Sequence, residues 1–80
     1  MNTEKNEHWE RLSAVLEYAE GMSINYFSHY IGLTSSEGIY RIKRNMNRIG
    51  LCLAQRIVLR FPEIDIEWLL TGKGEMLRKQ

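Results

Sequence analysis

The stretch SINYFSHYIGLTSSEGIYRIKR, residues 23 to 44, decides the fold of this 80-residue chain. Apolar residues lie four apart in its first half and three apart in its second half, so each pair faces one side of a helix. Gly32 stands between the pairs and can adopt the left-handed backbone that ends a helix. The spacing predicts two short helices joined by a tight turn, a helix-turn-helix. The apolar residues are Phe27, Ile31, Ile39 and Ile42.

Serine residues are placed to cap both helices. Ser23 can cap the first, expected over Ile24 to Ile31, and Ser35 can cap the second, expected over about Ser36 to Arg44. Gly38 conflicts with this interpretation, because a glycine inside a helix costs about 1 kcal/mol relative to alanine. It predicts either a close helix crossing or an irregular first turn.

Hydrophobic periodicity predicts three further helices, over residues 8–20, near 51–60 and over 66–71. Pro62 stops the second of these, and Asp65 can cap the third. The chain is therefore predicted to be all-α, a compact five-helix domain over residues 1–80. Its ordered core should span about residues 8–72, and the tail 73–80 can fray. On the first helix the residues expected to face away from the core are Glu10, Arg11 and Glu17.

Length and composition narrow the class of protein. Eighty residues make a domain of marginal core size, so the helices must pack efficiently or find a partner. The single cysteine, Cys52, cannot form an internal disulfide, and the segment MNTEKNEHWE lacks the apolar core of a signal peptide. These features predict a cytoplasmic location. No apolar run approaches the roughly 20 residues that cross a bilayer, so no membrane partner is expected.

Catalytic constellations are hard to build from this sequence. His8 and His29 fall in different predicted elements without metal-ligand spacing, and Cys52 has no CxxC companion. Gly72-Lys73-Gly74 lacks the glycine spacing and the preceding strand of a phosphate loop. We therefore expect no enzymatic activity, no metal and no cofactor, and no small-molecule ligand is evident from the sequence.

The charges are distributed unevenly, although the net charge is only +1. Residues 1–40 carry six acidic and two basic residues, whereas residues 41–60 carry six basic residues and no acid. Such asymmetry is typical of a face that binds a polyanion. A solvated helix surface would explain the same charges equally well. The six basic residues are Arg41, Lys43, Arg44, Arg48, Arg56 and Arg60.

The outward side of the second helix of the motif could enter a DNA major groove. Arginine bonds guanine with two hydrogen bonds and glutamate accepts from cytosine, and each such contact gives about 1–3 kcal/mol of discrimination. A glutamate near phosphates is repelled unless it meets a cytosine amine or a basic partner such as Arg41. The residues expected to contact bases are Ser36, Glu37, Tyr40, Arg41 and Arg44. Those expected to contact phosphates are Ser23, Asn25, Thr34, Ser35, Lys43, Asn45, Asn47 and Arg48.

The phrase FPEIDIEWLLTGKGEML at residues 61–77, with IGL at 31–33 and IYRIK at 39–43, resembles the short bacterial and phage regulators with lambda-repressor-like domains. This group is often called the XRE family, and many members close with a phrase like FPEIN-x-x-WLLTGEGEML. The resemblance spans about Trp9 to Leu77. It implies a five-helix domain that binds double-stranded operator DNA, usually as a dimer, and represses or activates transcription. Relatives commonly carry Asn-Gly-Lys after the third helix, where this chain has Arg44-Asn45-Met46.

The predicted fourth helix has more apolar residues than one core face needs. Leu51, Val58 and Leu59 form a second stripe, which is either a symmetric dimer contact or a wide buried face. The leading hypothesis is a homodimeric, sequence-specific regulator that binds double-stranded DNA. The alternative is a protein-interaction module whose helix-turn-helix binds a toxin or a phage protein. A single-strand or RNA binder would need exposed stacking aromatic residues.

Overall fold

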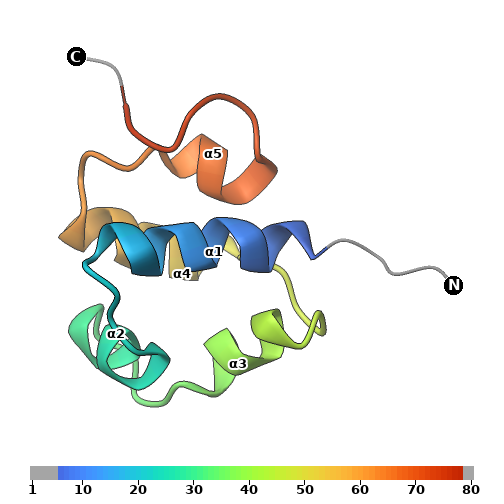
Figure 1. The fold of residues 1–80 in the computed structure, drawn as a ribbon, viewed down its shortest axis with the longest axis vertical. Coiled ribbons are helices and arrows are strands. Elements are labelled where there is room, and N and C mark those ends of the chain that lie inside the picture. The colour runs from blue at the N-terminus through green and yellow to red at the C-terminus, as the bar shows by residue number, and fades with distance from the viewer. Residues whose placement is uncertain (1–5, 79–80) are drawn as a thin grey trace, which may run out of the picture.

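The computed structural model describes residues 6 to 78, which form five helices (Figure 1). The predicted all-α class is confirmed, and so are the bounds of the last two helices. The first three helices end one or two residues short of the expected positions. The helices are α1 (Glu7–Tyr18), α2 (Ile24–Tyr30), α3 (Glu37–Lys43), α4 (Leu51–Arg60) and α5 (Ile66–Thr71).

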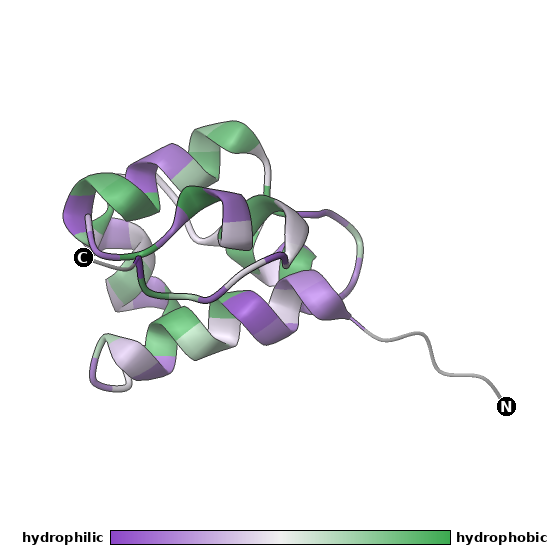
Figure 2. Ribbon diagram, turned by 90° about the horizontal axis from the view of Figure 1, so that it is seen from above, coloured by the Kyte–Doolittle hydropathy of each residue, from purple (hydrophilic) through white to green (hydrophobic). Residues whose placement is uncertain are grey.

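Helix α1 runs through the middle of the molecule, with α5 on one side and the pair α2–α3 on the other (Figure 1). It contacts both α3 and α5, while α4 contacts α5 and α2 contacts α3. Hydrophobic and hydrophilic residues alternate along the helices, as expected when each buries one face (Figure 2). None of the helices among residues 6–78 has the length and apolar character needed to cross a membrane.

All five helices contribute side chains to one hydrophobic core. The four apolar residues that predicted the helix-turn-helix are all buried, none more than 4% exposed. Fully burying a side chain of this size contributes about 1.5–3 kcal/mol, so these positions hold α2 and α3 against the rest of the domain. The largest fully buried side chains elsewhere are Leu12, Val15, Ile57, Ile64 and Leu69.

The ends of α2 and α3 follow from local chemistry. The Ser23 Oγ accepts a hydrogen bond from the Tyr26 N–H at 3.1 Å, which confirms its capping role. Gly32 has a φ of +88°, the left-handed conformation that ends α2. The expected cap of α3 is wrong by one residue, because Ser36 is the N-cap residue. The Ser35 Oγ instead accepts from the Glu37 N–H at 3.2 Å.

Arg11 is buried, contrary to the expectation that it faces away from the core. Its side chain is 8% exposed, and its Nε donates to the Leu69 carbonyl at 3.0 Å. This carbonyl belongs to the last turn of α5, where a cation is favoured by the helix dipole. Gly72 permits the approach, since a Cβ there would lie 2.8 Å from Arg11 Nη1. Arg11 therefore joins α1 to α5.

The chain after α5 turns back toward the segment before it. Ile64 and Leu77 form an isolated antiparallel bridge, in which the Asp65 N–H donates to the Met76 carbonyl at 2.8 Å. The Arg78 N–H donates to the Glu63 carbonyl at 2.7 Å. These contacts lie within the predicted tail 73–80, whose last two residues lie outside the described part of the chain.

Candidate nucleic-acid interface

The outward face of α3 presents three charged side chains among the five residues expected to contact bases. Glu37, Arg41 and Arg44 are exposed, on the side opposite the buried isoleucines of this helix. Ser36 and Tyr40 are half-buried. The three charged residues expected to contact bases therefore lie on one exposed surface, and the two polar ones beside them are partly covered.

Glu37 forms ion pairs with both arginines of this face. Its Oε2 lies 3.3 Å from Arg41 Nε and 3.7 Å from Arg44 Nη2. The three side chains are 47–60% exposed, so each pair is worth little in water, with a median of about 0–1 kcal/mol. The carboxylate lies beside the two guanidinium groups and can release them at small cost to a stronger acceptor.

The four hydroxyl and amide residues expected to contact phosphates near α2 and the turn are all exposed. Two of them, Ser23 and Ser35, use an oxygen lone pair to accept a backbone N–H at the start of a helix, Ser23 as the cap of α2 and Ser35 from Glu37 of α3. Their hydroxyl hydrogens can still be donated to an anion. The set comprises Ser23, Asn25, Thr34 and Ser35.

The loop after α3 carries three more of the expected phosphate contacts, and Asn45 determines its geometry. Asn45 has a φ of +63°, a left-handed conformation that asparagine tolerates better than most residues. Its N–H donates to the Ile42 carbonyl at 3.0 Å, and the Met46 N–H donates to the Arg41 carbonyl at 2.8 Å. These two bonds form a Schellman motif. Asn45 thus ends α3 at the position where the regulators that this sequence resembles commonly carry a glycine. Asn47 and Arg48 follow it in the loop, and both are exposed.

His8 attaches this loop to α1. The Ile49 N–H donates to His8 Nδ1 at 3.1 Å, and Arg11 Nη2 lies 3.2 Å from the same nitrogen. Burial lowers the pKa of His8 below 6.5, and repulsion by Arg11 and Arg48 lowers it further, against a small opposing effect of Glu7. The neutral imidazole is therefore the form that holds the loop. His8 and the exposed loop side chains line a shallow polar depression of about 470 Å³.

Asn6 attaches the end of α3 to the start of α1. Its Oδ1 accepts from the Trp9 N–H at 3.1 Å and caps α1, while its Nδ2 donates to the carbonyls of Ile42 at 2.8 Å and Lys43 at 3.2 Å. The sequence analysis missed both Asn6 and His8. An asparagine just before a helix is a recognisable capping signal, but no local pattern indicates contacts across 36 to 41 residues.

Two of the six basic residues of the segment 41–60 bond main-chain carbonyls. Arg56 Nη1 donates to the Gly32 carbonyl at 3.0 Å and lies 3.4 Å from the Ile31 carbonyl. Arg60 Nε donates to the Tyr30 carbonyl at 3.0 Å. Both arginines therefore satisfy carbonyls at the C-terminus of α2. The Nζ of Lys43, an expected phosphate contact, lies over the Trp9 ring, 5.7 Å from the ring centroid.

The expected dimer stripe on α4 is divided by the structure. Leu51 and Leu59 are 57% and 82% exposed, whereas Val58 is half-buried and packs against the core. The stripe is therefore narrower than predicted. Among residues 6–78, no group of three histidine, cysteine or acidic side chains could hold a metal ion.

Comparison with known proteins returned no relatives: no family model, no curated protein and no solved structure matches this chain.

Proposed function

We propose that this protein is a sequence-specific regulator of transcription, with a lambda-repressor-like arrangement of its helices and no catalytic activity. The observation that carries the proposal is the outward face of α3. Arg41 and Arg44 lie there on one exposed surface, and both are paired with Glu37. Arginine is the side chain most often used to read guanine in the major groove.

In the proposed complex α3 lies in the major groove of double-stranded DNA. Arg44 exchanges the Glu37 carboxylate for a guanine edge. Arg41 either does the same, so that Glu37 accepts from a cytosine, or bonds guanine through its Nη groups while its Nε stays paired with Glu37. In the turn before α3, the hydroxyl groups of Thr34 and Ser35 donate hydrogen bonds to backbone phosphates of one DNA strand. The loop after α3 supplies Asn47 and Arg48 at the other end of the same helix. Contacts at both ends of α3 would fix its register along the groove.

We further propose that the protein binds its operator as a homodimer through the exposed leucines of α4. A two-fold pair would place the two α3 helices about 34 Å apart on a palindromic site. Sedimentation of Leu59→Glu tests this contact, and Leu77→Glu is the control because Leu77 is also exposed, at 42%, but follows α5. A dimer that survives Leu59→Glu rules out this surface. Val58→Glu is a poorer test, since Val58 also packs against the core.

A protein-interaction module is the second candidate function. It is favoured by large apolar side chains outside α3 that are well exposed, such as Tyr26 at 59% and Met46 at 60%. Salt separates the two candidates. DNA affinity falls steeply with salt, because bound cations are released from the phosphates. A complex held by apolar contacts changes little.

Selection of bound duplexes from a random DNA pool, repeated at two salt concentrations, tests the proposed function directly. We expect an enriched motif with two-fold symmetry and weaker retention at the higher salt. A pool without an enriched motif would favour the protein-interaction module. Enrichment of single strands over duplexes would contradict the assignment of α3 to the major groove.

A further inference from the structure

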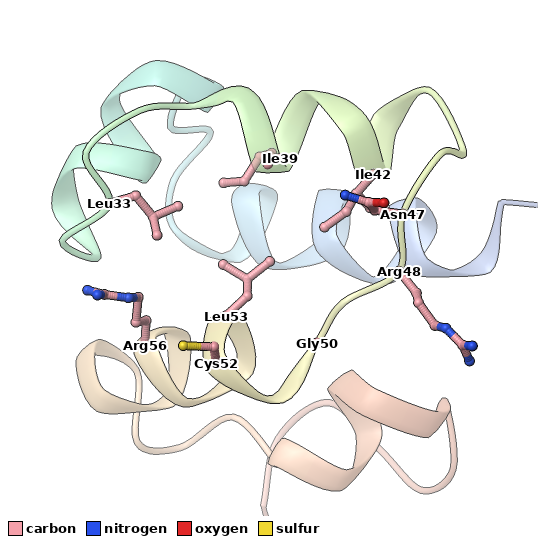
Figure 3. Close-up of a pocket in the computed structure, with 10 residues that line it drawn as sticks. Leu33, Ile39, Ile42, Asn47, Arg48, Gly50, Cys52, Leu53 and Arg56 are labelled. Carbon is pink, nitrogen blue, oxygen red and sulfur yellow. The ribbon is translucent and has the colours of Figure 1, made fainter.

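An apolar groove of about 280 Å³ lies between α3 and the first half of α4. Ile39 from α3 and Leu53 from α4 point toward one another across it (Figure 3). Leu33, from the turn before α3, closes one end. The groove arises only when helices from both halves of the chain pack together, and the sequence analysis therefore anticipated no such site.

The groove carries positive charge and no acid. Arg56 and Arg48 are among its lining residues, and no aspartate or glutamate is. Their guanidinium groups extend at opposite ends, that of Arg56 beside Leu33 (Figure 3). Neither arginine has an ion pair among residues 6–78, where the ion pairs found are those of Glu37. The field at this groove therefore favours an anion.

Arg56 is held in a fixed orientation by the main chain. Its Nη1 lies within hydrogen-bonding distance of the Ile31 and Gly32 carbonyls at the end of α2. A guanidinium carries five N–H donors, so those on Nε and Nη2 remain available. Arginine bonds a carboxylate with two parallel hydrogen bonds, and an ordered guanidinium loses little entropy when it does so.

Gly38 also belongs to the wall of this groove. A Cβ built at Gly38 meets nothing within 4 Å, which excludes the first of the two predicted alternatives, a close helix crossing. Its backbone does not require glycine either, since its φ is not among the positive values. Gly38 lines the groove, and the space beside its Cα is open. This gives a physical role to a residue that costs α3 about 1 kcal/mol.

We propose that the groove binds a small amphipathic carboxylate, with the carboxylate on Arg56 and the apolar body between Ile39 and Leu53. The volume of about 280 Å³ lies just below the lower limit of the range of ligand pockets, about 300–1,000 Å³. An apolar lining with one convergent charged group is also typical of such sites. Charge complementarity at Arg56 selects an anion over a neutral molecule of the same shape.

The position of the groove connects it to the proposed DNA-binding face. At about 100° per residue, Gly38 lies between Arg41 and Ile42 around α3, so a ligand would contact the helix beside Arg41. A change in DNA affinity on ligand binding rests on the proposed function. Binding of the ligand itself does not, and it is measured without DNA.

The test is a titration of the protein with octanoate and, separately, with 1-octanol, followed by backbone amide NMR in the absence of DNA. We expect saturable shifts at the amides of Leu33, Gly38 and Leu53. Octanoate should bind at least about tenfold more tightly than 1-octanol, because only the acid forms charge-assisted hydrogen bonds. Equal affinity for the two compounds, or shifts spread over the whole surface, would overturn the proposal.

Matched variants locate the carboxylate. Arg56→Gln should reduce octanoate affinity to that of 1-octanol, whereas Arg60→Gln, one turn later and outside the groove lining, should not. Equal losses in both variants would contradict the assignment to Arg56. Since Arg56 also bonds the end of α2, Gly38→Leu supplies an independent variant. It should fill the groove and weaken both compounds while the protein stays folded, and unchanged affinity would place the ligand elsewhere.

Discussion

Two pairs of arginines from the acid-free segment 41–60 have different partners. Arg41 and Arg44 on α3 are exposed and paired with the equally exposed carboxylate of Glu37. Arg56 and Arg60 on α4 bond main-chain carbonyls at the C-terminus of α2. The first pair can change partner at little cost, because water already screens its ion pairs. The second pair holds α2 and α4 together.

This difference shows why the count of charges was an incomplete guide to the surface. A run of six basic residues without an acid predicts a positive face. In the folded chain a guanidinium also serves as a donor to helix ends. Arg56 and Arg60 bond main-chain carbonyls in this way, while the other four basic residues of the run lie on α3 and in the segment that follows it.

The largest effect is expected for Arg41→Ala on DNA affinity. The variant should bind the selected operator about 5- to 150-fold more weakly, which corresponds to the loss of one base contact of about 1–3 kcal/mol. Its thermal stability should be nearly unchanged, because the side chain is exposed. Fluorescence anisotropy with a labelled duplex measures the affinity. Lys73→Ala is the control, and an equal loss in both variants would mean that charge alone is responsible.

Arg56→Ala should have the opposite profile. We expect the free energy of unfolding to fall by about 1–2 kcal/mol, because the carbonyls at the end of α2 lose a charged donor. Urea denaturation followed by circular dichroism gives this value. Arg48→Ala is the matched control, since Arg48 is exposed in the loop, and it should change stability by less than about 0.5 kcal/mol. Similar stabilities for the two variants would contradict a stabilising role of the hydrogen bonds between Arg56 and the end of α2.

Glu37→Gln sharpens the comparison within α3. The substitution frees Arg41 and Arg44 and removes a charge that repels phosphates. Affinity for every duplex should rise by a few-fold, in line with a surface pair of about 0.2–1 kcal/mol. Selection from a random pool should return the wild-type motif if Glu37 only positions the arginines. If the motif selected by the variant no longer prefers cytosine at one position, Glu37 itself recognises that base.

The smallest effect concerns pH and His8. The pKa of His8 is lowered in the folded protein, so below about pH 6.5 the unfolded chain takes up a proton first. The free energy of unfolding should therefore fall as the pH drops below 6.5, and should level off below the folded-state pKa. Urea denaturation between about pH 5 and pH 8 measures this slope. His8→Gln should flatten it, while His29→Gln, which keeps His8, should not.

Local patterns determined the helices of this protein. The spacing of the buried isoleucines, the cap at Asp65 and the stop at Pro62 act over one or two turns, which a sequence displays directly. The bounds of α4 and α5 could be predicted for this reason. The charged side chains of the candidate site also followed, since burial of one face of α3 determines which residues lie on the other.

The sequence by itself thus determined five helices, their order and the outward face of α3. Only the tertiary structure decided what long polar side chains do. Asn6, His8, Arg11 and Arg56 bond main-chain groups 24 to 58 residues away. Such bonds form wherever packing brings an unsatisfied helix end within reach. Periodicity describes the faces of a helix and carries no information about distant carbonyls, so the groove between α3 and α4 and the attachment of the loop to α1 emerge only in the folded chain.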